Sequence, residues 1–138
     1  MSIDLPEFFF RTRDNGAFVF RVNVGERQKR MDLDQIAVVN LNNGNVKAHG
    51  QHTLTDEEKA AIDEWMADRT AQLRIRDLDD IERTIDHLNR VSHWANSKAS
   101  DDDLEAFTDR LLLTMHDLRA VLVRKKADRL MARQQAAE

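Results

Sequence analysis

The chain has no cysteine and no tyrosine, only one proline and only four glycines in 138 residues. Without cysteine it forms no disulfide, binds no zinc through thiolates and has no thiol nucleophile. The few glycines are not arranged as a phosphate loop or a dinucleotide-binding fingerprint. We therefore expect a protein that is stabilised by packing alone and that resides in a reducing compartment, the cytoplasm.

Long apolar runs and a large charge of one sign are also missing. No stretch approaches the roughly 18 to 20 apolar residues of a membrane-spanning helix, and the N-terminus lacks the basic and apolar regions of a secretion signal. The 21 basic and 25 acidic residues give a net charge of -4, which argues against a protein that binds nucleic acid with its whole surface. We expect no membrane partner, and a local basic face stays open as an alternative.

Recognisable catalytic motifs are absent too, among them Gly-x-Ser-x-Gly and His-Glu-x-x-His. His49 and His52 are close enough in sequence to share a metal, but no third ligand lies at a recognisable spacing. An enzyme would need these histidines to converge with the acidic strip formed by Asp79, Glu82 and Asp86. A solvated helix face is the simpler interpretation of that strip. We predict no enzymatic activity, no cofactor and no metal site.

Residues 1–50 predict an antiparallel meander, because short runs of alternating apolar and polar residues are separated by turn signals. A strand over 8–12 and a second strand over 18–22 flank the segment 14–16, Asp-Asn-Gly. This tripeptide supplies the backbone conformations of a tight hairpin turn and is the strongest hairpin signal in the chain.

The rest of the predicted sheet follows the same logic. Alternation over 27–33 predicts a further strand, and the apolar stretch 35–41 predicts a central strand. A second turn at 42–45, Asn-Asn-Gly-Asn, precedes a short edge strand that contains Val46 and Ala48. We expect an antiparallel sheet of about four strands.

The side of this sheet that faces away from the core is the first candidate site. Alternation in the two hairpin strands places Phe8, Phe10, Phe18 and Phe20 together in the core. The opposite side then carries an aromatic ring among arginines, a pattern that suits phosphate binding or base stacking. Its residues are Phe9, Arg11, Arg13, Val19 and Arg21, with Arg30 as a further candidate. In the alternative interpretation this side packs on helices or stays solvated with cross-strand charge pairs.

Helical periodicity begins after Thr55, where Thr55 and Glu58 form the sequence pattern of a capping box. The pattern predicts one helix from Asp56 to about residue 74 and a second from Asp77 to about residue 96. No glycine or proline separates the two segments, so a single bent helix over 56–96 is the alternative.

A third helix begins after Ser100, an N-cap residue that is followed by three aspartates. It extends from Asp101 to about residue 135, roughly 50 Å at 1.5 Å per residue, which exceeds the width of a compact domain of this size. We therefore predict an α+β fold with a sheet part over 1–50 and a helical part over 54–138. The last two helices form a long antiparallel hairpin.

The third helix carries a continuous apolar stripe that predicts a homodimer interface. The interface candidates are Trp94, Leu104, Phe107, Leu111, Met115, Leu118 and Leu122. A basic cluster near the C-terminus predicts either an arm for nucleic acid or another anionic partner, or a solubilising helix end. It consists of Arg124, Lys125, Lys126 and Arg129.

These features favour a non-enzymatic interaction or regulatory protein. In this hypothesis it dimerises through its helices and presents a sheet surface to a partner protein. The alternative hypothesis is a DNA-binding regulator that uses the arginine and aromatic sheet face together with the basic C-terminal arm.

Overall fold

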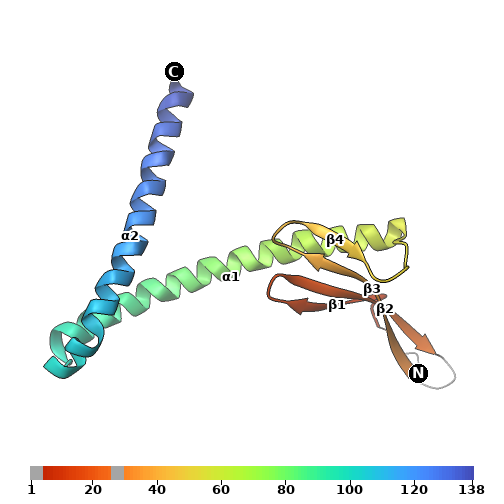
Figure 1. Ribbon diagram of the computed structural model, residues 1–138, viewed down its shortest axis with the longest axis horizontal. Coiled ribbons are helices and arrows are strands. Elements are labelled where there is room, and N and C mark those ends of the chain that lie inside the picture. Colours follow the sequence, from red (N-terminus) through yellow and green to blue (C-terminus); the bar gives the residue numbers. More distant parts are fainter. Residues whose placement is uncertain (1–4, 26–29) are drawn as a thin grey trace. The chain divides into compact units, whose positions relative to one another are not determined.

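The computed structural model describes residues 5–25 and 30–138. The chain order is β1 (Phe8–Arg13), β2 (Gly16–Gly25), β3 (Arg30–Asn40), β4 (Asn45–Ala48), α1 (Asp56–Ser97) and α2 (Asp101–Ala137) (Figure 1). The strands form one antiparallel sheet in the order β1-β2-β3-β4. The predicted α+β class, with four strands followed by helices, is confirmed.

The chain divides into two compact units, Met1–Asp80 and Ile81–Glu138. The first unit contains the sheet and the first part of α1, and the second contains the rest of α1 and all of α2. The predicted division into 1–50 and 54–138 follows the boundary between sheet and helices instead. None of the described helices is long and apolar enough to cross a membrane.

Residues 30–40 form a single strand where the sequence predicted two. Residues 27–29 of the predicted strand over 27–33 lie outside the described residues. The register between β2 and β3 shifts at Val19 and Phe20, which is a β-bulge. The extra residue is Ile36 of β3, which has no partner in the register, and both Ile36 and the next residue, Ala37, are buried, at 3% and 0% exposure. The change in the apolar pattern therefore reflects a bulge within one strand and not a turn between two strands.

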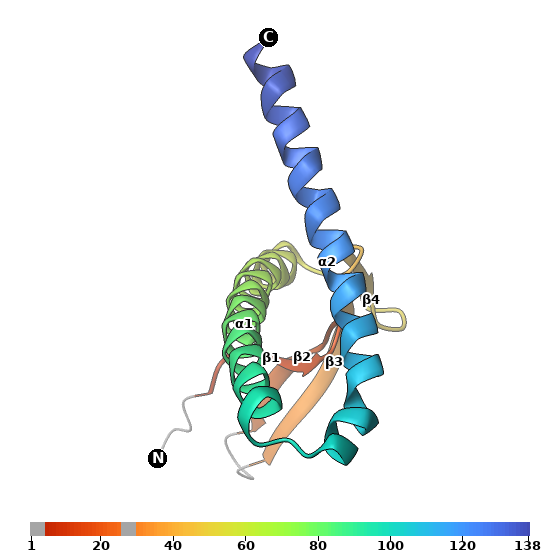
Figure 2. The same cartoon turned by 90° about the vertical axis from the view of Figure 1, so that its left-hand side faces the viewer.

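The core of the first unit lies between one face of the sheet and the first turns of α1 (Figure 2). Ile62 of α1, 1% exposed, packs with Val19 and Ala37 of the central strands. At the edge of this core, the rings of Phe10 and Trp65 stack with centroids 5.0 Å apart. Together these contacts seat the amphipathic start of α1 on the sheet.

α1 is one helix of 42 residues, so the predicted break near residues 74–77 is wrong and the alternative of a single helix is confirmed. Its sequence contains no glycine and no proline. Asp77, which was predicted to cap a new helix, lies inside α1. A capping residue alone does not interrupt a helix when its neighbours favour helix on both sides.

Both predicted helix starts are confirmed. The Thr55 hydroxyl accepts a hydrogen bond from Glu58 N at 3.1 Å, and the Glu58 carboxylate accepts one from Thr55 N at 2.9 Å. Ser100 Oγ accepts a hydrogen bond from Asp103 N at 3.1 Å and caps α2. The two helices of the predicted hairpin meet in the second unit, where the end of α1 and the start of α2 lie side by side next to the turn that connects them (Figure 1).

Replacing Gly16 with alanine is expected to destabilise the sheet strongly. An added Cβ would lie 1.8 Å from the carbonyl oxygen of Val39, so the backbones of β2 and β3 would have to separate. We expect a loss of about 3 kcal/mol in the free energy of unfolding, measured by urea denaturation with circular dichroism. Gly44→Ala is the control, because a Cβ there meets nothing within 4 Å and only the left-handed backbone, with φ of 71°, is strained. Equal losses in the two variants would contradict this account.

Candidate functional site

α1 packs against one face of the sheet, and the opposite face, called the open face below, is the candidate site. In an antiparallel sheet, directly paired residues point to the same face. Phe10 pairs with Val19, and both lie on the face that α1 covers, where Val19 is 0% exposed. Phe9 pairs with Phe20, and both lie on the open face.

A two-residue turn between β1 and β2 determines these faces. Arg13 pairs directly with Gly16, so only Asp14 and Asn15 connect the strands. The sequence prediction had counted Gly16 as part of the turn. A shift of one residue in register moves every side chain of a strand to the other face.

The predicted faces of β2 are therefore wrong, although those of β1 are correct. Phe18 and Phe20 lie on the open face, opposite Phe8 and Phe10, although Phe20 is buried there at 8% exposure. Val19 and Arg21 lie on the covered face. The predicted neighbours Phe9, Arg11 and Arg13 do share the open face.

The strand residues of the open face include three cations and no carboxylate within the described part of the chain. The cations are Arg11, Arg13 and Lys47. Lys47 belongs to this face because it pairs with Val38, which in turn pairs with Phe18. The remaining side chains are apolar or uncharged: Phe9, Phe18, Phe20, Val22, Val24, Met31, Leu33, Gln35, Val38, Asn40 and Asn45.

The arginines of the open face lie over phenylalanine rings. The guanidinium carbon of Arg11 is 4.6 Å from the ring centre of Phe20, and that of Arg13 is 4.8 Å from the ring centre of Phe18. Each contact of this kind contributes roughly 0.5 to 1 kcal/mol at an exposed site. Neither guanidinium forms an ion pair with another described residue. Their N–H groups are therefore available to an anionic partner.

An apolar hollow of about 180 Å³ lies on the same face, and Arg11 lies over one of its lining residues, Phe9. It is lined by Leu5, Pro6, Phe9, Val22, Met31 and Leu33. Phe9 is 40% exposed and Met31 55% exposed, so the hollow opens to solvent. Its volume is below the roughly 300 Å³ at which small-molecule sites begin, and it suits one apolar side chain better than a cofactor.

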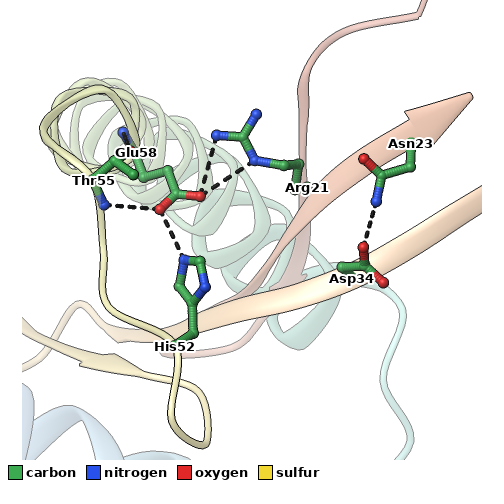
Figure 3. A network of polar contacts seen from close by, with 6 residues as sticks. All are labelled: Arg21, Asn23, Asp34, His52, Thr55 and Glu58. Atoms are coloured by element: carbon green, nitrogen blue, oxygen red, sulfur yellow. Dashed lines mark hydrogen bonds and ion pairs between the residues drawn. The ribbon is translucent and has the colours of Figure 1, made fainter.

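Arg21 has a different role from the one predicted, because it binds a buried carboxylate on the covered face (Figure 3). Its Nε and Nη2 atoms donate to Oε2 of Glu58 at 3.3 and 3.2 Å. The other carboxylate oxygen, Oε1, accepts hydrogen bonds from Thr55 N at 2.9 Å and from His52 Nε2 at 2.8 Å. Glu58 is 1% exposed. Arg21 is therefore part of the packing between α1 and the sheet.

These hydrogen bonds control the ionisation of Glu58. Burial raises the pKa of this carboxyl, but the hydrogen bonds from Thr55, His52 and Arg21 outweigh burial and lower the pKa from 4.5 to about 2. His52 donates from Nε2, because an ionised carboxylate can only accept. One of the two histidines considered as metal ligands is thus a capping partner.

The remaining predicted binding residues are Arg30 and the basic cluster near the C-terminus. The Arg30 backbone pairs with Gly25, and its side chain lies outside the description. The predicted basic cluster, Arg124, Lys125, Lys126 and Arg129, is exposed on α2 and belongs to the second unit.

Five of the seven residues that were predicted to form a dimer interface come together in the second unit. A groove of about 240 Å³ lies between the end of α1 and the start of α2. The residues that line this groove include Trp94, Leu104, Phe107, Leu111 and Met115. Leu118 and Leu122, further along α2, are 50% and 59% exposed.

Among the aromatic and charged residues of the open face, sequence reasoning missed three. Phe18 and Phe20 were assigned to the core, and Lys47 was not considered. Counting the turn as two residues would have found the phenylalanines, and pairing the short edge strand with the central strand would have found the lysine.

Among the described residues, no group of three or more histidine and carboxylate side chains is arranged to hold a metal ion. Comparison with known proteins yields no significant match to any family model, curated protein or solved structure. The surfaces of the protein are therefore the basis for inferring its function.

Glu58→Gln is expected to destabilise the protein in a pH-dependent way. A carboxyl with a lowered pKa stabilises the fold above its unfolded pKa, and this stabilisation disappears as the pH falls from about 4.5 to about 2. We expect the variant to lose roughly 2 to 3 kcal/mol at pH 7 and to match the unmodified protein near pH 2. Urea denaturation across this pH range measures the difference.

Glu57→Gln is the matched control, one residue away. Hydrogen bonding with Glu7 and repulsion from it raise the pKa of Glu57, so its carboxylate does not stabilise the fold at neutral pH. This variant should lose no stability at pH 7. A pH-independent loss in Glu58→Gln would contradict the role assigned to its charge.

Proposed function

We propose that the protein is a non-enzymatic adaptor or regulatory protein that self-associates through its helices and presents the open face to a partner protein. One observation carries the proposal: the described strand residues of the open face include three cations and no carboxylate, and one of these cations, Arg11, lies over Phe9 at the edge of an apolar hollow. Such a surface complements a segment that carries one apolar side chain among carboxylates, with an apolar centre and a charged rim. The lack of cysteine fits a reducing location, and the proposal places the protein in the cytoplasm.

The geometry favours a protein partner over nucleic acid. Base stacking needs aromatic rings with open faces, but Arg11 and Arg13 lie over Phe20 and Phe18. The hollow beside Phe9 is lined only by apolar side chains, which give base edges no hydrogen-bonding partner. An apolar anchor residue of a protein would bury its surface there.

DNA binding is the second candidate function, and the same three cations favour it. In this version Arg11, Arg13 and Lys47 contact phosphates, and the basic cluster of α2 adds further contacts. Arg21 takes no part, because Glu58 holds it on the covered face.

Self-association is supported by the exposure of the second helix. α2 has 37 residues and none of them is buried. A helix gains most of its stability from packing an apolar face, and a large exposed apolar patch marks an interaction surface.

Selection of peptides on the immobilised full-length protein tests the primary proposal. Random peptides that bind should combine Asp or Glu with one Leu, Phe or Trp. We expect Phe9→Ala and the double variant Arg11→Ala/Arg13→Ala each to weaken binding of a selected peptide by about tenfold or more in fluorescence anisotropy. Lys126→Ala, on α2, is the control and should bind normally. The proposal would be overturned if the selected peptides bound these open-face variants as tightly as they bind the unmodified protein.

Binding of a mixed-sequence DNA duplex separates the two candidates. The primary proposal predicts no micromolar binding at low salt. Micromolar binding that weakens by orders of magnitude between about 50 and 200 mM salt, and that an Arg11→Ala/Arg13→Ala/Lys47→Ala variant abolishes, would establish the DNA-binding alternative instead.

A further inference from the structure

The apolar stripe of α2 needs a second surface to cover it. The stripe consists of Leu104, Phe107, Leu111, Met115, Leu118 and Leu122. Met115, Leu118 and Leu122 are 51%, 50% and 59% exposed. Packing of the stripe against another helix would provide the burial that a helix of this length lacks on its own.

The second unit already contains a place for such a helix. Near the connecting turn, Leu88 and Trp94 of α1 and Leu104 and Phe107 of α2 line a groove. Along α2 the lining of this groove ends at Met115, so the rest of the stripe lies outside it (Figure 2 shows α2 along its length). A third helix laid along the stripe of α2 would contact the end of α1 as well.

The charges of α2 indicate what that helix is. Its first turn contains Asp101, Asp102 and Asp103, whereas its last part contains the basic cluster. Two parallel copies of α2 would place like charges side by side, and two antiparallel copies place the acidic start of one beside the basic end of the other.

A column of alternating charges flanks the stripe. The column consists of four exposed residues at intervals of seven: Asp103, Arg110, Asp117 and Arg124. Residues seven apart lie on the same side of a helix, next to the residues one position further along, among them Leu104, Leu111 and Leu118. The column therefore lies where contacts between two paired helices form.

We infer that α2 pairs with α2 of a second copy in antiparallel orientation, which rests on the self-association in the proposed function. A midpoint between Leu113 and Thr114 puts Asp103 opposite the partner's Arg124, and Arg110 opposite the partner's Asp117. The stripe, from Leu104 to Leu122, is centred on almost the same point. Hydrophobic and charged contacts thus require the same register.

This register also fills the groove. The second half of the partner's α2 runs beside the first half of α2, so the partner's Leu118 and the partner's Leu122 lie near Leu104 and Phe107. Since those two residues line the groove together with Trp94, the partner helix covers the end of α1. By symmetry the same contacts form twice.

Self-association itself is measured first, by sedimentation equilibrium of the full-length protein. We expect a dimer at micromolar concentration. A monomer at all concentrations would overturn both the self-association of the proposed function and the antiparallel pairing.

Thiol cross-linking then determines the orientation of the two helices. The chain has no native cysteine, so only the introduced thiols react. The variants are Asp103→Cys and Arg124→Cys, treated with a short bismaleimide. Positions 103 and 124 are about 31 Å apart along one helix, so in an antiparallel dimer neither variant cross-links with itself, whereas a mixture of the two does. Asp102→Cys is the control, because it points away from the stripe and should cross-link poorly with Arg124→Cys.

Two results of this experiment would overturn the antiparallel pairing while leaving self-association intact. One is a dimer in which Asp103→Cys cross-links with itself. The other is a dimer in which the mixture of Asp103→Cys and Arg124→Cys does not cross-link at all.

Charge reversal provides an independent test. We expect Asp103→Arg to raise the dimer dissociation constant about tenfold, because it faces the partner's Arg124 twice in each dimer. Adding Arg124→Asp should restore the dissociation constant to within about threefold of the original value. The two positions are too far apart to interact within one helix, so restoration has to act between copies. A larger loss in the double variant than in either single variant would contradict the antiparallel register.

Discussion

The buried carboxylate of Glu58 is the interaction on which the first unit depends. It receives hydrogen bonds from Arg21 on β2, from His52 in the connecting loop and from Thr55 at the start of α1. A buried charge is costly unless it is paired, so these partners must be in place whenever the unit is folded. Ile62 lies one turn further along on the same side of α1. The contacts that fix Glu58 therefore also turn Ile62 toward the core.

The two units bury apolar surface in different ways. In the first unit a bulged sheet and one helix enclose a core, with Val19, Ala37 and Ile62 almost fully buried. In the second unit the apolar side chains of α2 stay accessible along its length. One part of the chain thus resembles an ordinary domain, and the other resembles half of an interface.

Local signals were read correctly from the sequence, and the failures have a common physical origin. The capping box at Thr55, the N-cap at Ser100 and the first hairpin of the sheet depend on neighbouring residues, and the structure contains all three. The faces of β2 depended on whether Gly16 belongs to a turn or to a strand, a difference of one residue that inverts a strand.

Other features depend on residues that are far apart in the sequence. The capping box predicted that Glu58 would bind Thr55, but nothing local indicated that Arg21, 37 residues away, would meet the same carboxylate. The continuity of α1 past Asp77 was equally hard to predict, because a capping residue is compatible with both a helix start and a helix interior.

The stacking of Arg11 and Arg13 on phenylalanine rings has a consequence for the thermodynamics of recognition. A free arginine side chain gives up about 2 kcal/mol of rotamer entropy when it is fixed. Here the rings of Phe20 and Phe18 restrict both side chains before any partner arrives. Part of the side-chain entropy is therefore lost during folding and not on binding. A carboxylate that binds these arginines would then lose less binding free energy to the ordering of their side chains.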